Sequence, residues 1–204
     1  MEVNVLLFDD FDSLDAFGPA EVLGNAAGDF HLNYLSVPGN MINSMQGVKV
    51  WTEPLEPEEV SGIVLIPGGR GARRILFQDS EMLRLIKRAV SKAEYCMMVS
   101  SGAAIVSQTG LLYRRKIAEC KVDENRRRMF MGGVSIVKGA SWVSDGKYYS
   151  SSDSVSGIAM ALSMVADLAD LDLAVRIAEQ RGYDWDMEAE RGFQEKFPPM
   201  DLRQ

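Results

Sequence analysis

The 204-residue chain carries 47% hydrophobic residues, 25% charged residues and a formal net charge of −7. A chain of this length can bury a core large enough to fold without disulfides or a structural metal. Its acidic balance argues against nucleic-acid or anionic-membrane partners, and no apolar run is long enough to span a bilayer. With no basic leader before the first apolar strand, we expect one cytoplasmic domain, residues 1–204.

Short apolar runs alternate along the chain with segments of helical periodicity. The pattern predicts strands at 3–8, 30–37, 48–53, 62–66 and 95–99, and a hairpin around an Asp-Gly turn within 141–152. It predicts helices at 14–26, 80–93, 101–108, 156–169 and 171–183, with Pro19 near the first turn of the first helix and Ser80 as the cap of the second. We therefore expect an α/β fold whose mostly parallel sheet has helices on both faces.

Three loops follow strands of this predicted sheet, at 9–15, 67–74 and 100–102. Ligands of open parallel sheets bind outside the carboxyl ends of the strands. The third loop is the most informative, because the apolar run Tyr95–Val99 breaks sharply into Ser100-Ser101-Gly102. A strand, a tight turn and a helix form the geometry that presents a nucleophile.

The two cysteines, Cys96 and Cys120, are too few and too far apart for a disulfide framework or a zinc site. Cys96 lies within an apolar strand, which predicts a buried and unreactive thiol. A displaced reactive thiol at Cys120 is disfavoured, because the sequence places no helix N-terminus or fixed cation near it.

Four stretches together resemble the ThiJ/PfpI superfamily: "FDDFDSLDAFGPAEVL", "VLIPGGRGARRIL", "VSSGAAIVSQTGLLYRRKIA" and "SDGKYYSSSDSVSGIAMAL". Within it, the chain is most similar to the isocyanide hydratases and to proteins described as intracellular protease/amidase. The resemblance runs from Val3 to about Asp184. It implies a flavodoxin-like three-layer sandwich that is usually a homodimer. We also expect a small-molecule substrate or ligand, no cofactor and no metal.

The same resemblance implies a cysteine nucleophile in a Val-Cys-Thr-Gly-Ala motif, and here that position is Ser100. It assigns Glu21 as the acid that hydrogen-bonds the nucleophile and Asp15 as the acid that handles protons in hydratase-like relatives. Gly68 and Gly69, with the backbone N–H of Ser101, would form an oxyanion hole.

Two further positions depart from the family pattern. Cys120 stands where many relatives have a His or Asn, and Ala159 stands where a further acid is often found. An engineered cysteine-to-serine change at residue 100 would give the same letters, but these two departures favour natural replacement.

Each candidate also has a structural interpretation. Asp15 can be a helix cap, Glu21 an exposed helix residue, and Gly68-Gly69 a tight turn that needs glycine. His31, the single histidine, is expected to be a surface or structural residue. The arginines at 70, 73 and 74 could attract an anionic ligand, although the sequence favours a solvated face.

Two functions remain open at this stage. The leading hypothesis is a protein with weak or lost cysteine-type catalysis, a possible pseudoenzyme that binds a small molecule, because a hydroxyl is not ionised as easily as a thiol. The alternative is an active hydratase or hydrolase in which Ser100 attacks and Asp15 shuttles protons. The sensory domain of a transcription regulator fits poorly, because no basic helix-turn-helix segment follows residue 180. A redox-sensor role would need the cysteine that Ser100 replaces.

Overall fold

The computed structural model describes residues 1–26, 28–120, 125 and 129–185. At its centre is an eight-stranded sheet with the order β3-β4-β2-β1-β5-β6-β10-β9, and β7 pairs with β8 in a separate two-stranded sheet. The strands are β1 (Glu2–Leu6), β2 (His31–Ser36), β3 (Asn40–Asn43), β4 (Lys49–Pro54), β5 (Ile63–Ile66), β6 (Tyr95–Val99), β7 (Lys116–Ala118), β8 (Ser135–Val137), β9 (Trp142–Asp145) and β10 (Tyr148–Ser151).

The central pairings are all parallel, as the sequence pattern predicted. β1 lies between β2 and β5, and β6 lies between β5 and β10. Antiparallel pairs occur at the two edges, where β3 pairs with β4 and β9 pairs with β10 around the predicted Asp145-Gly146 turn. β5 is buried at every residue, and β6 is buried at every residue after the partly buried Tyr95, so these two strands form the centre of the core.

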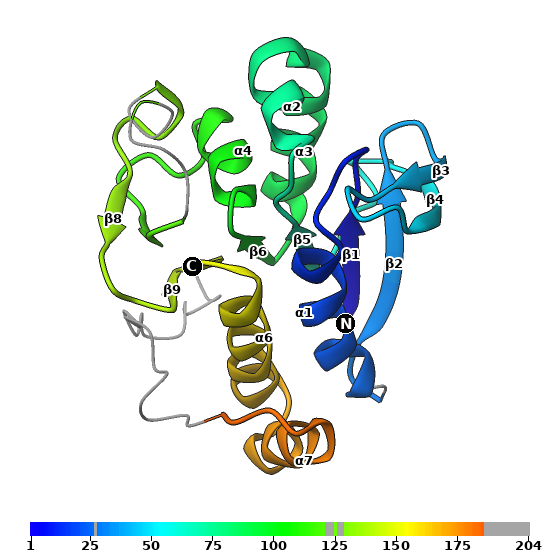
Figure 1. Cartoon of the computed structure of the whole chain (residues 1–204), viewed down its shortest axis with the longest axis vertical. Helices are drawn as coiled ribbons and strands as arrows, with labels where there is room; N and C mark the ends of the chain where they lie inside the picture. The colour runs from blue at the N-terminus through cyan, green and yellow to red at the C-terminus, as the bar shows by residue number, and fades with distance from the viewer. Residues whose placement is uncertain (27, 121–124, 126–128, 186–204) are drawn as a thin grey trace, which may run out of the picture.

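The helices form two layers (Figure 1). They are α1 (Ser13–Asn25), α2 (Ala72–Gln78), α3 (Ser80–Lys92), α4 (Gly102–Gln108), α6 (Ser154–Leu168) and α7 (Leu171–Arg181). The chain moves from β1 toward one sheet edge through α1 and from β5 toward the other edge through α2 and α3. Because parallel crossovers are right-handed, these opposite movements place α1 and α3 on opposite faces. α1 packs against α6, while α2 and α3 pack against α4. The predicted fold class is therefore confirmed.

Glycines let α6 approach its neighbours closely. A Cβ built at Gly157 would lie 3.1 Å from a methyl of Val99 and 3.4 Å from Pro19, and one at Gly18 would lie 3.0 Å from Ile158. This close packing holds the beginning of α6 beside α1 and beside the end of β6.

Several details differ from the sequence prediction. The cap of α3 is Asp79, whose carboxylate accepts from the Met82 N–H, and Ser80 is the first helical residue. α1 begins at Ser13, so Pro19 lies in the helix interior. Proline has no N–H, and the backbone carbonyl of Asp15, four residues earlier, therefore lacks its usual helical partner. The pattern also missed α2, β3 and the β7–β8 pair, which are short.

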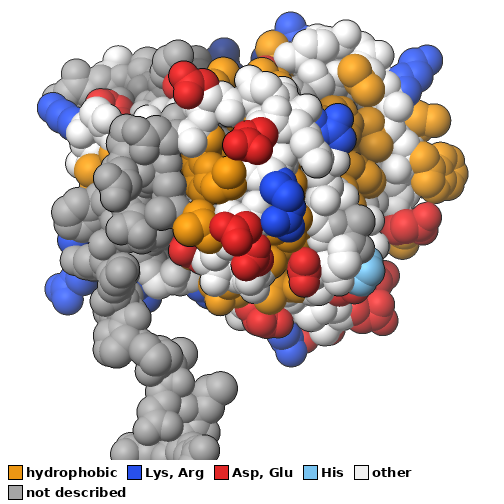
Figure 2. Space-filling view, turned by 90° about the horizontal axis from the view of Figure 1, so that it is seen from below, with side chains coloured by type: hydrophobic (Ala, Val, Ile, Leu, Met, Phe, Trp, Pro, Cys, Tyr) orange, Lys and Arg blue, Asp and Glu red, His pale blue; other side chains and the backbone are white. Residues whose placement is uncertain are grey.

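The surface at the bottom of Figure 1 carries Lys and Arg dispersed among Asp and Glu, as Figure 2 shows for the described residues of that face. No helix among the described residues is long and apolar enough to cross a membrane. The basic run 126–128 and the tail from residue 186 lie outside the described residues.

Candidate active site

The three predicted loops meet at the carboxyl edge of the sheet. The Asp12 N–H donates to the Gly68 carbonyl at 2.9 Å, and the Gly71 N–H donates to the Asp10 carbonyl at 3.0 Å. Phe11 forms an isolated antiparallel bridge with Gly69. The first and second loops are therefore joined by backbone hydrogen bonds, and the third joins them through the side chain of Ser101.

Ser100 occupies the sharp turn between β6 and α4. Its φ of 51° is left-handed, a conformation that non-glycine residues rarely adopt and that is often retained at functional sites. Its N–H donates to the Ser151 carbonyl at 3.2 Å, and its carbonyl accepts from the Ala103 N–H at 3.3 Å. Ser100 is partly exposed, whereas the preceding Val99 is fully buried. The elbow geometry expected from the sequence is present.

Gly102 lets this elbow form. A Cβ at Gly102 would lie 2.3 Å from the carbonyl oxygen of Ile66, closer than real atoms approach. The Ser-Ser-Gly sequence therefore combines a partly exposed side chain with a glycine where β5 and α4 meet.

Asp15 is a buried acid that contacts the second loop of the site. It is 2% exposed and lies in the first turn of α1, but it does not cap the helix, since Asp12 accepts from the N–H groups of Leu14 and Asp15. One carboxylate oxygen of Asp15, Oδ2, accepts from the Gly68 N–H at 3.0 Å, and the other, Oδ1, accepts from the Ser154 hydroxyl at 2.5 Å.

Burial raises the pKa of Asp15 from 3.8 to about 6, because the charged form loses its hydration. The hydrogen bonds from Ser154 and Gly68 stabilise the carboxylate and oppose this shift. A carboxyl with this pKa is present in both protonation states near neutral pH and can therefore accept or donate a proton.

The Gly68-Gly69 turn links Asp15 to Ser101. The Gly69 N–H donates to the Ser101 hydroxyl oxygen at 3.2 Å. A Cβ at Gly68 would lie 2.6 Å from that hydroxyl oxygen and 2.7 Å from Asp15 Oδ2. Only glycine fits at residue 68 without displacing one of these two groups. Of the three N–H groups expected to form an oxyanion hole, those of Gly68 and Gly69 therefore donate to side chains of the protein in this structure.

Glu21 is placed elsewhere. Its carboxylate pairs with the Arg181 guanidinium at 2.8 Å and accepts from the Asn25 amide at 3.0 Å and the Tyr183 hydroxyl at 3.0 Å. These partners join α1 to α7 and to the residues that follow α7. The structure thus gives Glu21 a role in helix packing, where the family resemblance had implied a contact with the nucleophile position.

The remaining sequence candidates lie in different surroundings. Cys96 is fully buried in β6, and burial raises the pKa of its thiol to about 12. Cys120 is 1% exposed, and Ala159 is buried in α6. His31 is exposed at the first residue of β2, which is the amino end of that strand, so it lies at the opposite edge of the sheet from Ser100.

Ser154 is a site residue that the sequence analysis missed. It opens α6, whose cap is Asp153, and the cap accepts from the Ser156 N–H. The Ser-Asp-Ser sequence before an apolar helix is a recognisable N-terminal signature. The signature places the helix start, but it does not show that the Ser154 hydroxyl reaches Asp15 across 139 residues of sequence.

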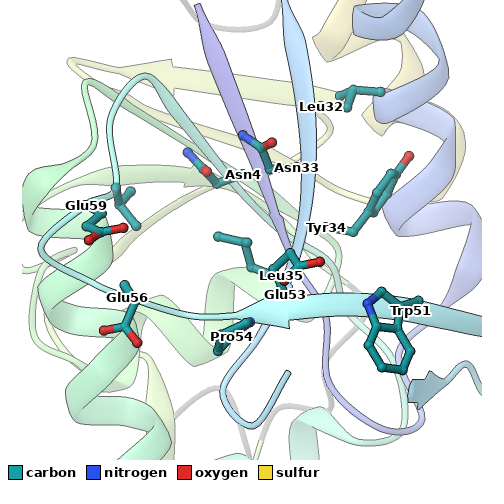
Figure 3. Close-up of a pocket in the computed structure, with 11 residues that line it drawn as sticks. Asn4, Leu32, Asn33, Tyr34, Leu35, Trp51, Glu53, Pro54, Glu56 and Glu59 are labelled. Atoms are coloured by element: carbon teal, nitrogen blue, oxygen red, sulfur yellow. The ribbon is translucent and has the colours of Figure 1, made fainter. Parts of the chain in front are cut away.

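Two hollows lie away from the Ser100 elbow. One of about 500 Å³ lies along α2. The other, of about 460 Å³, lies around β2 and β4 and has Asn4, Asn33, Trp51 and several glutamates in its lining (Figure 3). Neither is lined by Ser100 or Asp15. Among the described residues, no group of three His, Cys, Asp or Glu side chains could hold a metal ion.

Most of the sequence matches the model of a known family. Residues 1–167 match the model of the DJ-1/PfpI family. The chain belongs to this family. The matched region contains every site residue expected from the sequence, including the Ser100 elbow.

Individual relatives agree with this assignment. An isonitrile hydratase from Pseudomonas putida is 25% identical over 184 residues, which cover 90% of this chain and 78% of that protein. A ThiJ/PfpI family protein from Pseudomonas syringae superposes with a TM-score of 0.75 at 22% identity, covering 100% of this chain and 78% of the other. DJ-1 from Toxoplasma gondii, in an oxidised form, gives 0.72 at 21% identity, with 90% and 99% covered. At these identities the two solved structures establish the DJ-1/PfpI fold.

Proposed function

We propose that this protein binds a small molecule at a site of the isonitrile-hydratase type, and that its cysteine-type catalysis is weak or lost. The observation that carries the proposal is Ser100 on an intact elbow, at a φ of 51° and at the position where the family resemblance implies cysteine. The 25% identical isonitrile hydratase supports this type of site. The scaffold persists while the reactive group has changed.

The change of side chain weakens the expected chemistry. A thiol can be ionised near neutral pH with modest help from its surroundings, whereas a serine hydroxyl needs a positioned base. The single histidine is at the other edge of the sheet. Asp15 is the nearby acid, but both of its oxygens already accept hydrogen bonds.

A second candidate function is an active hydratase or hydrolase that uses Ser100. The raised pKa of Asp15, about 6, favours this version, because such a carboxyl can take the hydroxyl proton and later return it. With an isonitrile, Ser100 Oγ would bond to the terminal carbon while its proton passes through Asp15 to that carbon. Water would then add to the same carbon and displace Oγ, which regains a proton, and an N-substituted formamide would leave. For ester or amide substrates, the Gly68 and Gly69 N–H groups would have to exchange their present partners for an oxyanion.

The test compares turnover by the parent protein, Ser100→Cys and Ser100→Ala with an isonitrile, a p-nitrophenyl ester, methylglyoxal and a peptide amide. Ser80→Cys is the matched control, because Ser80 is an exposed serine at the start of α3. Activity that appears in Ser100→Cys but not in Ser80→Cys would support a scaffold that lacks only its nucleophile. Strong activity in the parent that disappears in Ser100→Ala would reject the leading proposal and establish the second candidate.

We also propose the homodimer that the family resemblance implies. Two exposed apolar residues on neighbouring strands support a dimer contact there: Met41 on β3 is 49% exposed, and Trp51 on β4 is 62% exposed. Light scattering coupled to size-exclusion chromatography measures the mass directly, and a monomer at micromolar concentration would refute the proposal.

A further inference from the structure

The hollow along α2 brings three guanidinium groups and an aromatic ring together. It measures about 500 Å³ and is lined by Arg70, Arg73, Arg74, Phe77 and Gln78. Positions separated by three, four and seven residues fall on one face of a helix, so α2 and the residues just before it present cations and ring together. The volume lies in the usual range for small-molecule sites.

The positive charge of this face is only partly neutralised. Arg70 pairs with Asp10 at 2.9 Å, in an exposed ion pair of the kind that contributes little. The Arg74 guanidinium reaches the Asp9 carbonyl at 3.5 Å, which is long for a hydrogen bond. Arg73 has no ion pair among the described residues. The chain as a whole carries −7, so this face is a local exception in an acidic protein.

Phe77 supplies a fixed apolar surface beside these cations. Its side chain is 51% exposed, yet its ring packs edge-on against Phe130 at a centroid distance of 4.8 Å and an interplanar angle of 90°. Phe130 is buried and serves as the support. An exposed ring held in this way can receive a flat apolar group on its free face.

We propose that this hollow binds a small anion carried on an aromatic body, such as an aryl phosphate. The anionic group pairs with Arg73 and Arg74, because the guanidinium fork matches the geometry of phosphate and carboxylate oxygens. The aromatic body lies against Phe77. Arg70 directly follows Gly69, so this site adjoins the loop that contacts Ser101, but the proposal does not depend on any reaction at Ser100.

The first experiment titrates phenyl phosphate into the parent protein by isothermal calorimetry, with inorganic phosphate and phenol as the two halves of the ligand. We expect saturable binding of phenyl phosphate that is at least tenfold tighter than that of either half. Amide chemical-shift changes measured by NMR should centre on Phe77 and Gln78. The absence of saturable binding at millimolar ligand, or shifts centred on the elbow, would overturn the proposal.

Variants then separate a specific site from general charge attraction. The double variant Arg73→Gln, Arg74→Gln should lose at least tenfold in affinity for phenyl phosphate. The matched control is Arg84→Gln, Arg88→Gln, which removes two exposed arginines of α3 and changes net charge equally. The control should stay within twofold of the parent. Phe77→Ala should reduce phenyl phosphate binding to the level of inorganic phosphate. Equal losses in the two double variants would reject the site.

Discussion

Replacing Asp15 by asparagine should stabilise the protein at neutral pH. The carboxyl is 2% exposed, and its pKa rises from 3.8 in the unfolded chain to about 6 in the folded protein. This rise of about 2 pKa units corresponds to a cost of about 3 kcal/mol for keeping the charged form in the fold. Asparagine has nearly the same shape, can accept from Gly68 N–H, and can donate to the Ser154 hydroxyl oxygen. It therefore removes the charge while keeping both contacts.

The stability difference between the parent and Asp15→Asn should grow as the pH rises. Below pH 3.8 the carboxyl is protonated in both states, so parent and variant should be similar in stability. As the pH rises from 3.8 to about 6, the unfolded chain releases its proton first, and the parent should lose up to about 1.4 kcal/mol per pH unit relative to the variant. Above pH 6 the difference should level off near its maximum, with about 3 kcal/mol as the upper bound.

Urea unfolding of both proteins at intervals between pH 4 and pH 8 measures this difference, because effects of other titrating groups cancel in the comparison. Asp170→Asn is the matched control. Asp170 caps α7 by accepting from Leu173 N–H, and asparagine caps helices about as well as aspartate. A variant that is less stable than the parent at pH 8, or a difference that does not vary with pH, would refute the assigned environment of Asp15.

Two further substitutions test the placement of other residues. Gly68→Ala should lower the free energy of unfolding by roughly 2 kcal/mol or more, because the new methyl would lie 2.6 Å from the Ser101 hydroxyl oxygen and 2.7 Å from Asp15 Oδ2. Gly132→Ala is the control in the same urea assay and should be nearly neutral, because its methyl enters open space. Glu21→Gln should cost about 1 kcal/mol of stability by weakening the bonds to Arg181 and Tyr183. Introduced into Ser100→Cys, it should leave turnover of the four substrates unchanged, and a loss of turnover without a loss of stability would contradict the placement of Glu21.

The order of strands and helices could be predicted from the sequence because it depends on local patterns. Fully apolar runs such as Tyr95–Val99 can only be buried on both faces, and the helical segments between them require parallel crossovers. The elbow at Ser100 was also predictable, because a buried strand that breaks into small residues able to open a helix is the strand–turn–helix pattern, although its left-handed φ of 51° was not predicted. Short elements such as α2 and β3 were missed, because a few residues carry too little periodicity to be recognised.

The roles of the two acids show the limit of this reasoning. Asp15 and Glu21 lie on one predicted helix, and either could face the site. They are six positions apart, so they lie on different turns of α1. The partners of each acid depend on which segment of the chain packs against its own turn. Asp15 meets Gly68 and Ser154, while Glu21 meets Arg181 and Tyr183.

The sequence by itself determined the fold class, the family resemblance, the serine at the nucleophile position and the three loops that carry the site, since all of these follow from residues close together in the chain. Only the tertiary structure decided that Ser154 binds Asp15, that burial raises the pKa of this acid, and that Phe130 supports Phe77 beside the arginines of α2. The physical reason is that burial and hydrogen bonding depend on which distant segments meet, and these contacts leave no periodic signal in the sequence.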